Sequence, residues 1–299
     1  MGRFLVIANQ KGGVGKTTTA INLAVALTQT NQGSGNLPIL LVDLDPQGNA
    51  TSGLTPAAQL GEIKASGKTI YEAIIGRIQV TDALRKIRQS IYLLPSGADL
   101  VGAEVELATV EGRERCLKEL LAPLRTQYSF ILIDTPPSLG LLTLNAMVAA
   151  DSIMVPMQCE YYALEGLSAL LGTIARVRKV LNPALEIGGI VLTMFDARNR
   201  LSHEIAIDVN RHFPDKLFQS VIPRNVRLSE SPSHGLSVIE YDSKSAGAEA
   251  YRSLAEEVAQ RAGGSAAAMK AELPAEPTRK SWNLRALFSR DSGRVRRSG

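Results

Sequence analysis

One glycine-rich stretch constrains the fold of this chain more than any other feature: residues 9–19, with the sequence NQKGGVGKTTT. It follows an apolar run rich in strand-forming residues, 4–8, and precedes a segment of helical character, 20–27. Glycines allow a loop to curl with its N–H groups pointing inward, and the start of the following helix adds partial positive charge. The order strand, loop, helix therefore predicts a phosphate-binding loop.

The loop carries two lysines. Lys16 is placed to reach the β- and γ-phosphates of a nucleotide, and the Thr17 hydroxyl is placed to bind Mg²⁺. The loop departs from the usual pattern G-x-x-x-x-G-K-S/T, because Gln10 stands where that pattern begins with glycine. Lys11 follows it and is either a solvated loop charge or a second cation for the phosphates. Its position beside a phosphate cradle favours the second interpretation.

Composition limits the classes of protein to which the chain can belong. Its 299 residues are enough for one large core, and a hydrophobic content of 45% is typical of a globular domain. No apolar run approaches the roughly 18 residues that a membrane span needs, and we expect no signal peptide. Two cysteines, Cys116 and Cys159, are far apart in sequence, which indicates a reducing cytosol and no metal site built from cysteines.

Charge is distributed unevenly along the chain. The net charge is +4, but residues 264–299 hold eight Lys/Arg against three Asp/Glu and so carry +5. We therefore expect two parts, a near-neutral domain over residues 1–263 and a disordered basic C-terminal tail over residues 264–299. Nucleic-acid binding by the domain would have to come from a local patch.

Apolar runs and amphipathic segments alternate along residues 1–263. We expect strands at 39–43, 91–95, 130–134, 152–157, 187–194 and 217–222. We expect helices at 70–75, 80–87, 111–124, from 141 onward, and at 163–181, 201–213 and 246–261. This alternation predicts an α/β fold, with a doubly wound, mostly parallel sheet flanked by helices, as in P-loop NTPases.

Two of the predicted strands end in aspartate. Asp43 closes the run 39–43 and is followed by Asp45, and Asp134 closes the run 130–134. Open α/β sheets bind ligands at the carboxyl ends of their strands. Asp134 can be a Walker B ligand for Mg²⁺ or the N-cap of the helix from residue 141, and its pairing with the glycine loop favours the metal ligand.

Several longer segments resemble one known family. The loop from Lys11 to Thr17 resembles the deviant Walker A loop of the ParA/MinD superfamily of ATPases. Residues 43–51 (DLDPQGNAT), 134–138 (DTPPS), 158–166 (QCEYYALEG) and 223–235 (PRNVRLSESPSHG) resemble the chromosomal ParA (Soj) branch. The resemblance covers roughly residues 3–262 and fits the short type, without an N-terminal helix-turn-helix domain. The chain departs from the family in a longer loop at 31–38 and in the tail after residue 263.

The resemblance implies a nucleotide site that uses ATP and Mg²⁺. It implies that Lys11 reaches the phosphates of a partner subunit, and that the phosphates are cradled by Gly12, Gly13, Val14, Gly15 and Lys16. It implies that Thr17 and Asp134 bind Mg²⁺, that Thr18 lies at the α-phosphate and that Asp45 positions the attacking water. The residues implied to lie beside the adenine are Pro223, Arg224 and Asn225. Asp43 is a rival of Asp45 for the catalytic role.

The resemblance also implies partners. ATP would drive formation of a sandwich homodimer that binds DNA without sequence preference, and a ParB-type centromere-binding protein would stimulate hydrolysis and release the dimer. The protein would be cytoplasmic and associated with the nucleoid. Candidate DNA contacts, each of which could instead be a solvated surface charge, are Arg198, Arg200, Arg224, Arg227 and Lys244. Arg198 comes first because residues 193–198 resemble the family segment that carries a DNA-contacting arginine.

Three alternatives compete with this interpretation. A MinD-like membrane ATPase would need an amphipathic helix in the tail, where residues 282–290 are only weakly amphipathic, so we expect membrane binding to be unlikely there. A ParA relative could also position another cargo through an adaptor other than ParB. An iron protein is excluded because residues 135–150 contain no cysteine, and a GTPase is excluded because the chain has no N-K-x-D string.

Overall fold

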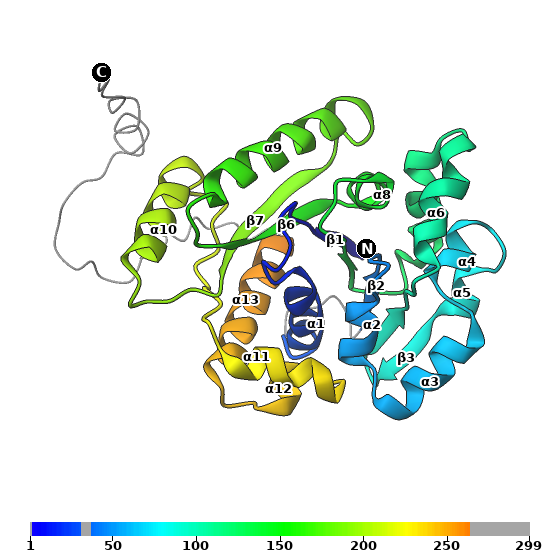
Figure 1. Ribbon diagram of the computed structural model, residues 1–299, viewed down its shortest axis with the longest axis horizontal. Helices are drawn as coiled ribbons and strands as arrows, with labels where there is room; N and C mark the ends of the chain where they lie inside the picture. Colours follow the sequence, from blue (N-terminus) through cyan, green and yellow to red (C-terminus); the bar gives the residue numbers. More distant parts are fainter. Residues whose placement is uncertain (1, 31–36, 264–299) are drawn as a thin grey trace, which may run out of the picture.

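A computed structural model describes residues 2–30 and 37–263. The predictions made for the tail and for most of the long loop after the first helix lie outside these residues. The described residues form a seven-stranded sheet with the order β3-β4-β2-β5-β1-β6-β7 (Figure 1). The strands are β1 (Arg3–Ile7), β2 (Ile39–Asp43), β3 (Arg85–Arg88), β4 (Ile91–Leu94), β5 (Phe130–Asp134), β6 (Ser152–Gln158) and β7 (Glu186–Thr193). Neighbouring strands pair in parallel, except that β3 pairs antiparallel with β4.

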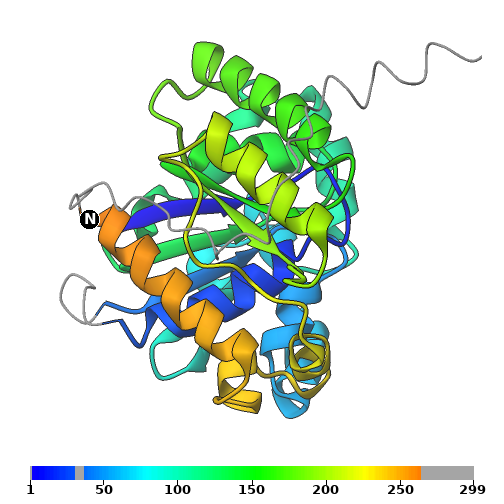
Figure 2. The ribbon, with the colours of Figure 1, turned by 90° about the vertical axis from the view of Figure 1, so that its left-hand side faces the viewer.

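Helices cover both faces of the sheet. The α-helices are α1 (Lys16–Leu27), α2 (Asn49–Leu54), α3 (Ala57–Ser66), α4 (Ile70–Ile74), α5 (Val80–Ala83), α6 (Leu100–Glu106), α7 (Cys116–Leu121), α8 (Leu141–Ala149), α9 (Ala163–Val180), α10 (Arg200–His212), α11 (Val226–Glu230), α12 (Val238–Tyr241) and α13 (Ala246–Ala262). Helices α1 and α13 lie side by side on one face, and α8 and α9 lie on the other (Figures 1 and 2). The prediction of a doubly wound α/β fold is confirmed.

Alternate residues of each central strand point to opposite layers. Leu5, Ile7 and Leu41 pack with the helices α1 and α13, whereas Val6 and Val42 pack in the core that includes α7, α8 and α9. Because both faces are covered, both sets of side chains are apolar. The central strands therefore appear in the sequence as continuous apolar runs, and the predicted bounds 39–43 and 130–134 match the structure.

The predicted strand at 217–222 is wrong. This segment lies beside β7 but forms no continuous strand. It makes an isolated bridge between Leu217 and Ile190, and at its far end Ile222 exchanges backbone hydrogen bonds with Leu192 and Phe195. The backbone N–H groups of Gln219 and Ser220 donate to the carboxylate of Glu257 on α13, at 2.9 and 2.7 Å. A side chain thus takes the donors at the centre of the segment, and the ladder with β7 is interrupted.

Two predicted helices are also shorter than expected. The segment 80–87 is helical only as far as Ala83, after which residues 85–88 form the antiparallel edge strand β3. In the segment 111–124 only α7 is an α-helix, and single 3-10 turns precede and follow it. Helix α5, strand β3 and helix α7 are each only four to six residues long, which is too short to show a clear helical or strand period in the sequence.

The topology places three strand ends together. Ile7 of β1 and Asp43 of β2 are both register partners of Asp134 of β5. After β1 the chain first forms β2, β3, β4 and β5 on one side of that strand, and it then adds β6 and β7 on the other side, so the direction of strand addition reverses at β1. The carboxyl edge at this reversal is where an open α/β sheet binds ligands.

No helix in the described ranges is both long and apolar enough to cross a membrane.

Candidate nucleotide-binding site

The phosphate loop joins β1 to α1 at the carboxyl edge of the sheet. Gly13 and Gly15 have φ values of 74° and 85°, in the left-handed region that strongly favours glycine. Gly15 is the N-cap of α1, and no side chain caps this helix start. The first N–H groups of α1 are therefore left for an anion, which is the arrangement of a phosphate site.

Three neighbouring strands hold this loop in place. The Thr193 hydroxyl at the end of β7 donates to the Val14 carbonyl at 2.8 Å, and the Thr135 hydroxyl after β5 donates to the Ile7 carbonyl at 2.8 Å. The buried Asn9 amide donates to the Pro156 carbonyl of β6 at 2.7 Å. The loop is thus fixed from both sides before any ligand binds, which lowers the entropy cost of binding.

Lys16 is almost completely buried at 7% exposure, and its ammonium donates to the Lys11 carbonyl at 3.1 Å. Burial lowers the pKa of Lys16, while the nearby carboxylates of Asp134 and Asp45 raise it. An ammonium in this position faces the inside of the loop and can exchange a neutral carbonyl for a charged phosphate oxygen, which binds it more strongly.

Asp134 is fully buried, and neither of its carboxylate oxygens has a hydrogen-bond partner among the described residues. Burial raises its pKa well above the ordinary value, and the charge of Asp43 raises it further. The nearby Thr17 hydroxyl and Lys16 lower this pKa, although the Thr17 hydroxyl makes no hydrogen bond of ordinary geometry with the carboxylate. An unpartnered carboxylate beside a hydroxyl is a donor set that fits Mg²⁺.

The alternative role of Asp134 as a helix cap does not hold. Helix α8 begins at Leu141 with Gly140 as its N-cap, and no side chain caps it.

Asp43 is engaged in the structure of the next turn. Its Oδ2 accepts hydrogen bonds from the backbone N–H and the hydroxyl of Thr51, both at 2.7 Å, and its Oδ1 accepts from the N–H of Asp45 at 3.2 Å. Burial raises the pKa of Asp43 to about 6 despite these bonds. The Thr51 hydroxyl in turn accepts from the N–H of Ser96 at 2.9 Å. Asp43 therefore ties the start of α2 to the sheet.

Asp45 has a less occupied carboxylate than Asp43. Its Oδ1 accepts a hydrogen bond from the N–H of Gln47 at 3.0 Å, and its backbone carbonyl accepts from the Ser96 hydroxyl at 2.8 Å. The backbone of Asp45 is thus fixed, and its carboxylate lies close enough to Lys16 for its charge to raise the pKa of that ammonium. This geometry favours Asp45 over Asp43 for orienting water.

Lys11 forms an ion pair with Glu160, in the segment between β6 and α9. Both side chains are 45% exposed. Glu160 was missed as a site residue, although it lies in the recognised segment 158–166. Nothing in the local pattern of charges connects it to a loop about 150 positions earlier.

The loop Pro223–Asn225 lies at the same edge of the sheet. Pro223 forms an isolated bridge with Phe195, and the N–H of Arg224 donates to the Phe195 carbonyl at 3.2 Å. This loop is therefore held beside the end of β7, and Thr193 at that strand end contacts the phosphate loop. The Asn225 side chain caps α11 by accepting from the N–H of Arg227 at 2.8 Å.

Comparison with known proteins agrees with this site. A family model described as an AAA domain matches residues 2–187. The chain is 48% identical over 264 residues to the chromosome-partitioning ATPase Soj of Treponema pallidum, covering 88% of this chain and 99% of that protein. It is 50% identical over 262 residues to the chromosome partitioning protein ParA of Caulobacter vibrioides, covering 87% and 94%. The chain belongs to the Soj/ParA family.

Solved structures place the Soj/ParA fold of this chain among nucleotide-binding proteins. A Mycobacterium smegmatis protein titled cobyrinic acid a,c-diamide synthase, with bound ADP and magnesium, has a TM-score of 0.76 at 35% identity, covering 92% of this chain and all of that one. The cell division ATPase MinD of Pyrococcus furiosus has a TM-score of 0.65 at 28% identity, covering 86% and 98%. These matches agree with the P-loop NTPase-like fold predicted from the sequence.

The candidate DNA contacts of this Soj/ParA chain fall into two groups. Arg198 and Arg224 flank Asp196, whose pKa is lowered first by hydrogen bonds from Arg198 and also by the charge of Arg224. Arg200 pairs with Glu204 at 2.8 Å on the first turn of α10.

The second group lies around α11 and the start of α13. Arg227 pairs with Glu230 at 2.8 Å and Asp242 at 3.3 Å, and Lys244 is exposed nearby in sequence. Arg227 has two acidic partners, whereas the Arg198 side chain is 91% exposed with Asp196 as its ion-pair partner. Arg198 is therefore the more available of these two cations.

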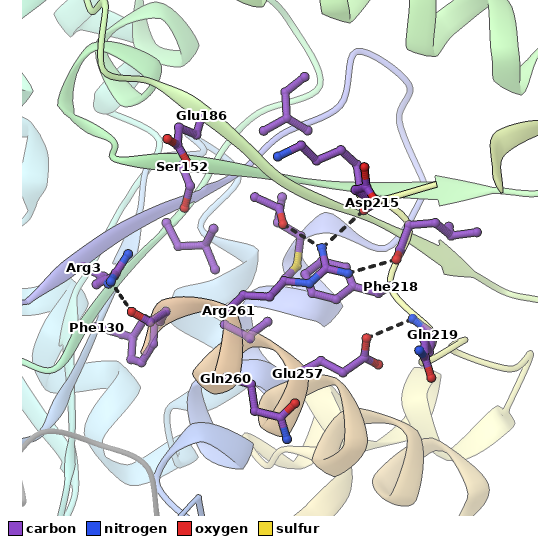
Figure 3. A pocket seen from close by; sticks show the side chains of 18 of the residues that line it. Arg3, Phe130, Ser152, Glu186, Asp215, Phe218, Gln219, Glu257, Gln260 and Arg261 are labelled. Atoms are coloured by element: carbon purple, nitrogen blue, oxygen red, sulfur yellow. Dashed lines mark hydrogen bonds between the residues drawn. The ribbon is translucent and has the colours of Figure 1, made fainter. Parts of the chain in front are cut away.

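A cavity of about 450 Å³ lies away from the site, near the amino ends of β6 and β7 and the end of α13 (Figure 3). Arg261 crosses it and donates to the carbonyls of Gly188 and Leu217, both at 2.9 Å, and its guanidinium lies 4.0 Å from the centre of the Phe218 ring. The arginine thus holds α13 to the sheet in this Soj/ParA domain.

The unpartnered carboxylate of Asp134 leads to a stability prediction. Because its pKa is raised in the folded chain, ionisation is penalised there, and the free energy of unfolding falls as the pH rises above the ordinary carboxyl range. Without Mg²⁺, Asp134→Asn should raise the free energy of unfolding by about 1–3 kcal/mol at pH 8 and by little at pH 4. Nucleotide binding that depends on Mg²⁺ should weaken in the same variant. Denaturant titrations at both pH values measure the first effect.

Asp151 provides the matched control, because its carboxylate pairs with Arg125 at 2.6 Å and accepts from the N–H of Phe4 at 2.9 Å. Asp151→Asn should lower stability. A similar loss in Asp134→Asn would mean that the Asp134 carboxylate has a partner in the folded chain.

Proposed function

We infer that the chain is an ATPase of chromosome or plasmid partitioning, the activity after which its relatives are named. We propose that ATP and Mg²⁺ bind at the carboxyl edge of the sheet, that the loaded chain dimerises, and that the dimer binds DNA without sequence preference. A ParB-type protein would stimulate hydrolysis and release the DNA. The observation that carries this proposal is the convergence of the buried Lys16 ammonium and the unpartnered Asp134 carboxylate on a preformed phosphate loop.

We propose residues 1–263 as the ATPase domain. Support comes from the lengths of the relatives, because the matches to Soj and ParA span 87–88% of this chain but 94–99% of theirs. Residues 264–299 would be an extension with a separate role, and the domain would act at the nucleoid.

Each site residue has a proposed role in this reaction. The loop from Gly12 to Lys16 and the Thr18 hydroxyl would bind the phosphates of ATP. Thr17 and Asp134 would hold Mg²⁺, which offsets the negative charge of the phosphates. Asp45 would orient the attacking water, and Asp43 would keep Asp45 in position by accepting a hydrogen bond from its backbone N–H. The loop Pro223–Asn225 would lie beside the adenine.

The other names found among similar structures receive less support. The diamide synthase matches at 35% identity, whereas the Soj and ParA relatives match at 47–50%. A MinD-like attachment to membranes would depend on the tail. Positioning of a different cargo differs from chromosome partition in its adaptor, and co-purification with a ParB-type protein encoded in the same genome would distinguish the two.

Lys11 should be required for dimerisation. In the proposed dimer its ammonium contacts the phosphates bound by the partner, so the nucleotide is part of the interface. Lys11→Ala should remain folded and bind ATP but stay monomeric, as measured by light scattering with a non-hydrolysable ATP analogue. A dimer of normal stability in this variant would contradict the proposed interface.

Asp45 and Asp43 should differ in the effect of their removal. Asp45→Ala should lower the rate of ATP hydrolysis at least about a hundredfold while ATP binding and dimerisation persist, because only the orientation of water is lost. Asp43→Ala should instead lower thermal stability, because Thr51 loses its acceptor. Turnover assays and thermal melts on both variants rank the two carboxylates. If Asp45→Ala abolishes ATP binding, its role is structural.

Arg198 should contribute to DNA binding. Arg198→Glu should abolish retention of non-specific duplex DNA while ATP-driven dimerisation persists, because a phosphate contact is replaced by repulsion. Fluorescence anisotropy at several salt concentrations measures the loss, and the affinity of the unmodified chain should fall steeply with salt. The control is Arg178→Glu, an exposed charge reversal on α9. Equal DNA affinities for the two variants would place the DNA contact elsewhere.

A further inference from the structure

The ion pair between Lys11 and Glu160 forms within one protomer. In the proposed function, however, the Lys11 ammonium contacts a nucleotide held by the partner. The two arrangements exclude each other, because one ammonium on one side chain cannot lie over its own β6–α9 segment and also in the partner's site. Glu160 therefore competes with the partner's nucleotide for the Lys11 ammonium, on which the proposed dimerisation depends.

Both members of the pair are fixed to the same strand. The Asn9 side chain donates to the Pro156 carbonyl of β6 at 2.7 Å and accepts from the N–H of Lys11 at 3.0 Å. The N–H of Glu160 donates to the carbonyl of Gln158, the last residue of β6, at 2.9 Å. Because the two backbones are already held at one strand end, pairing of the side chains orders little additional chain.

Nucleotide binding acts on the same contacts. The Lys11 carbonyl accepts from the ammonium of Lys16 at 3.1 Å. A phosphate in the loop would take this ammonium, because a charged acceptor binds it more strongly than a neutral carbonyl does. Lys11 would then lose one of the contacts that hold it over its own protomer, while the partner's phosphates compete for the other.

We propose that Glu160 is a positioning residue that holds the Lys11 ammonium on its own protomer until a partner's nucleotide displaces it. This inference rests on the proposed role of Lys11 in the dimer. The pair would weaken dimerisation, since each dimer that forms has to break two such ion pairs, one in each protomer. Chains without bound nucleotide would be kept from associating through the lysine.

The expected effect follows from the exposure of the pair. Ion pairs with both partners exposed change an equilibrium by a factor of about two to five, so the loss of two pairs changes the dimerisation constant about tenfold. With a non-hydrolysable ATP analogue, Glu160→Gln should dimerise at protein concentrations about tenfold lower than the unmodified chain. Sedimentation velocity on the full chain over a range of concentrations measures this shift.

Glu165→Gln is the matched control, because Glu165 is an exposed acid in the first turn of α9, without an ion pair to any described residue. It should dimerise like the unmodified chain. An unchanged or weaker dimer in Glu160→Gln would overturn the proposal, because Glu160 would then be neutral or would support the dimer. In thermal melts without nucleotide, Glu160→Gln should lose no more stability than one exposed ion pair contributes, whereas a structural role of Glu160 would lower the melting temperature further.

A second measurement does not require a dimer. In the chain without nucleotide, acylation of Lys11 followed by mass spectrometry should be a few times faster in Glu160→Gln, because the carboxylate no longer occupies the ammonium. Equal rates would show that Glu160 does not hold Lys11, and the inference would fail. If the unmodified chain does not dimerise with nucleotide, the proposed function fails instead, and the acylation rates still test the pair.

Discussion

The site depends on the burial of negative charge without full compensation. Asp134 is closed off from water, has no hydrogen-bond partner among the described residues and lies near the buried Asp43. A folded chain normally avoids this arrangement, because an unpartnered buried carboxylate costs stability. A bound cation would remove the cost. Ligands that bind only the folded form also stabilise it, so folding stability and ligand binding are linked at this carboxylate.

The other carboxylates at this edge differ in how far the protein already uses them. Asp43 accepts three hydrogen bonds from its own chain and belongs to the scaffold, whereas Asp45 accepts one and keeps free acceptor capacity. Parallel pairing creates the difference in position, since Asp43 and Asp134 end adjacent strands in register and Asp45 lies two residues beyond. The carboxylates of Asp43, Asp45 and Asp134 thus lie at one edge of the sheet in different environments.

The sequence predicted the parts of this structure that are determined locally. Central strands buried on both faces have to be apolar throughout, so 39–43 and 130–134 were found with their bounds. The glycines of the phosphate loop likewise reveal backbone conformations that other residues rarely adopt. The failures have long-range causes. The segment 217–222 has strand composition, but Glu257 of α13 takes its backbone donors. Glu160 lies far from Lys11 in sequence, and only the packing of β6 beside β1 brings them together.

The hydrogen bond between Thr193 and Val14 has a consequence for communication between sites. Thr193 ends β7, and the next residue, Met194, has a φ of 51°, which is the one positive φ at a non-glycine residue in the described ranges. Such a conformation persists only where the surroundings enforce it. Four residues further along the chain is Arg198. One hydrogen bond and one residue of uncommon backbone conformation thus connect the phosphate loop to the segment that carries Arg198. If occupancy of the loop alters that segment, thermodynamic reciprocity requires the converse: a polyanion on the arginine side changes nucleotide affinity by the same factor.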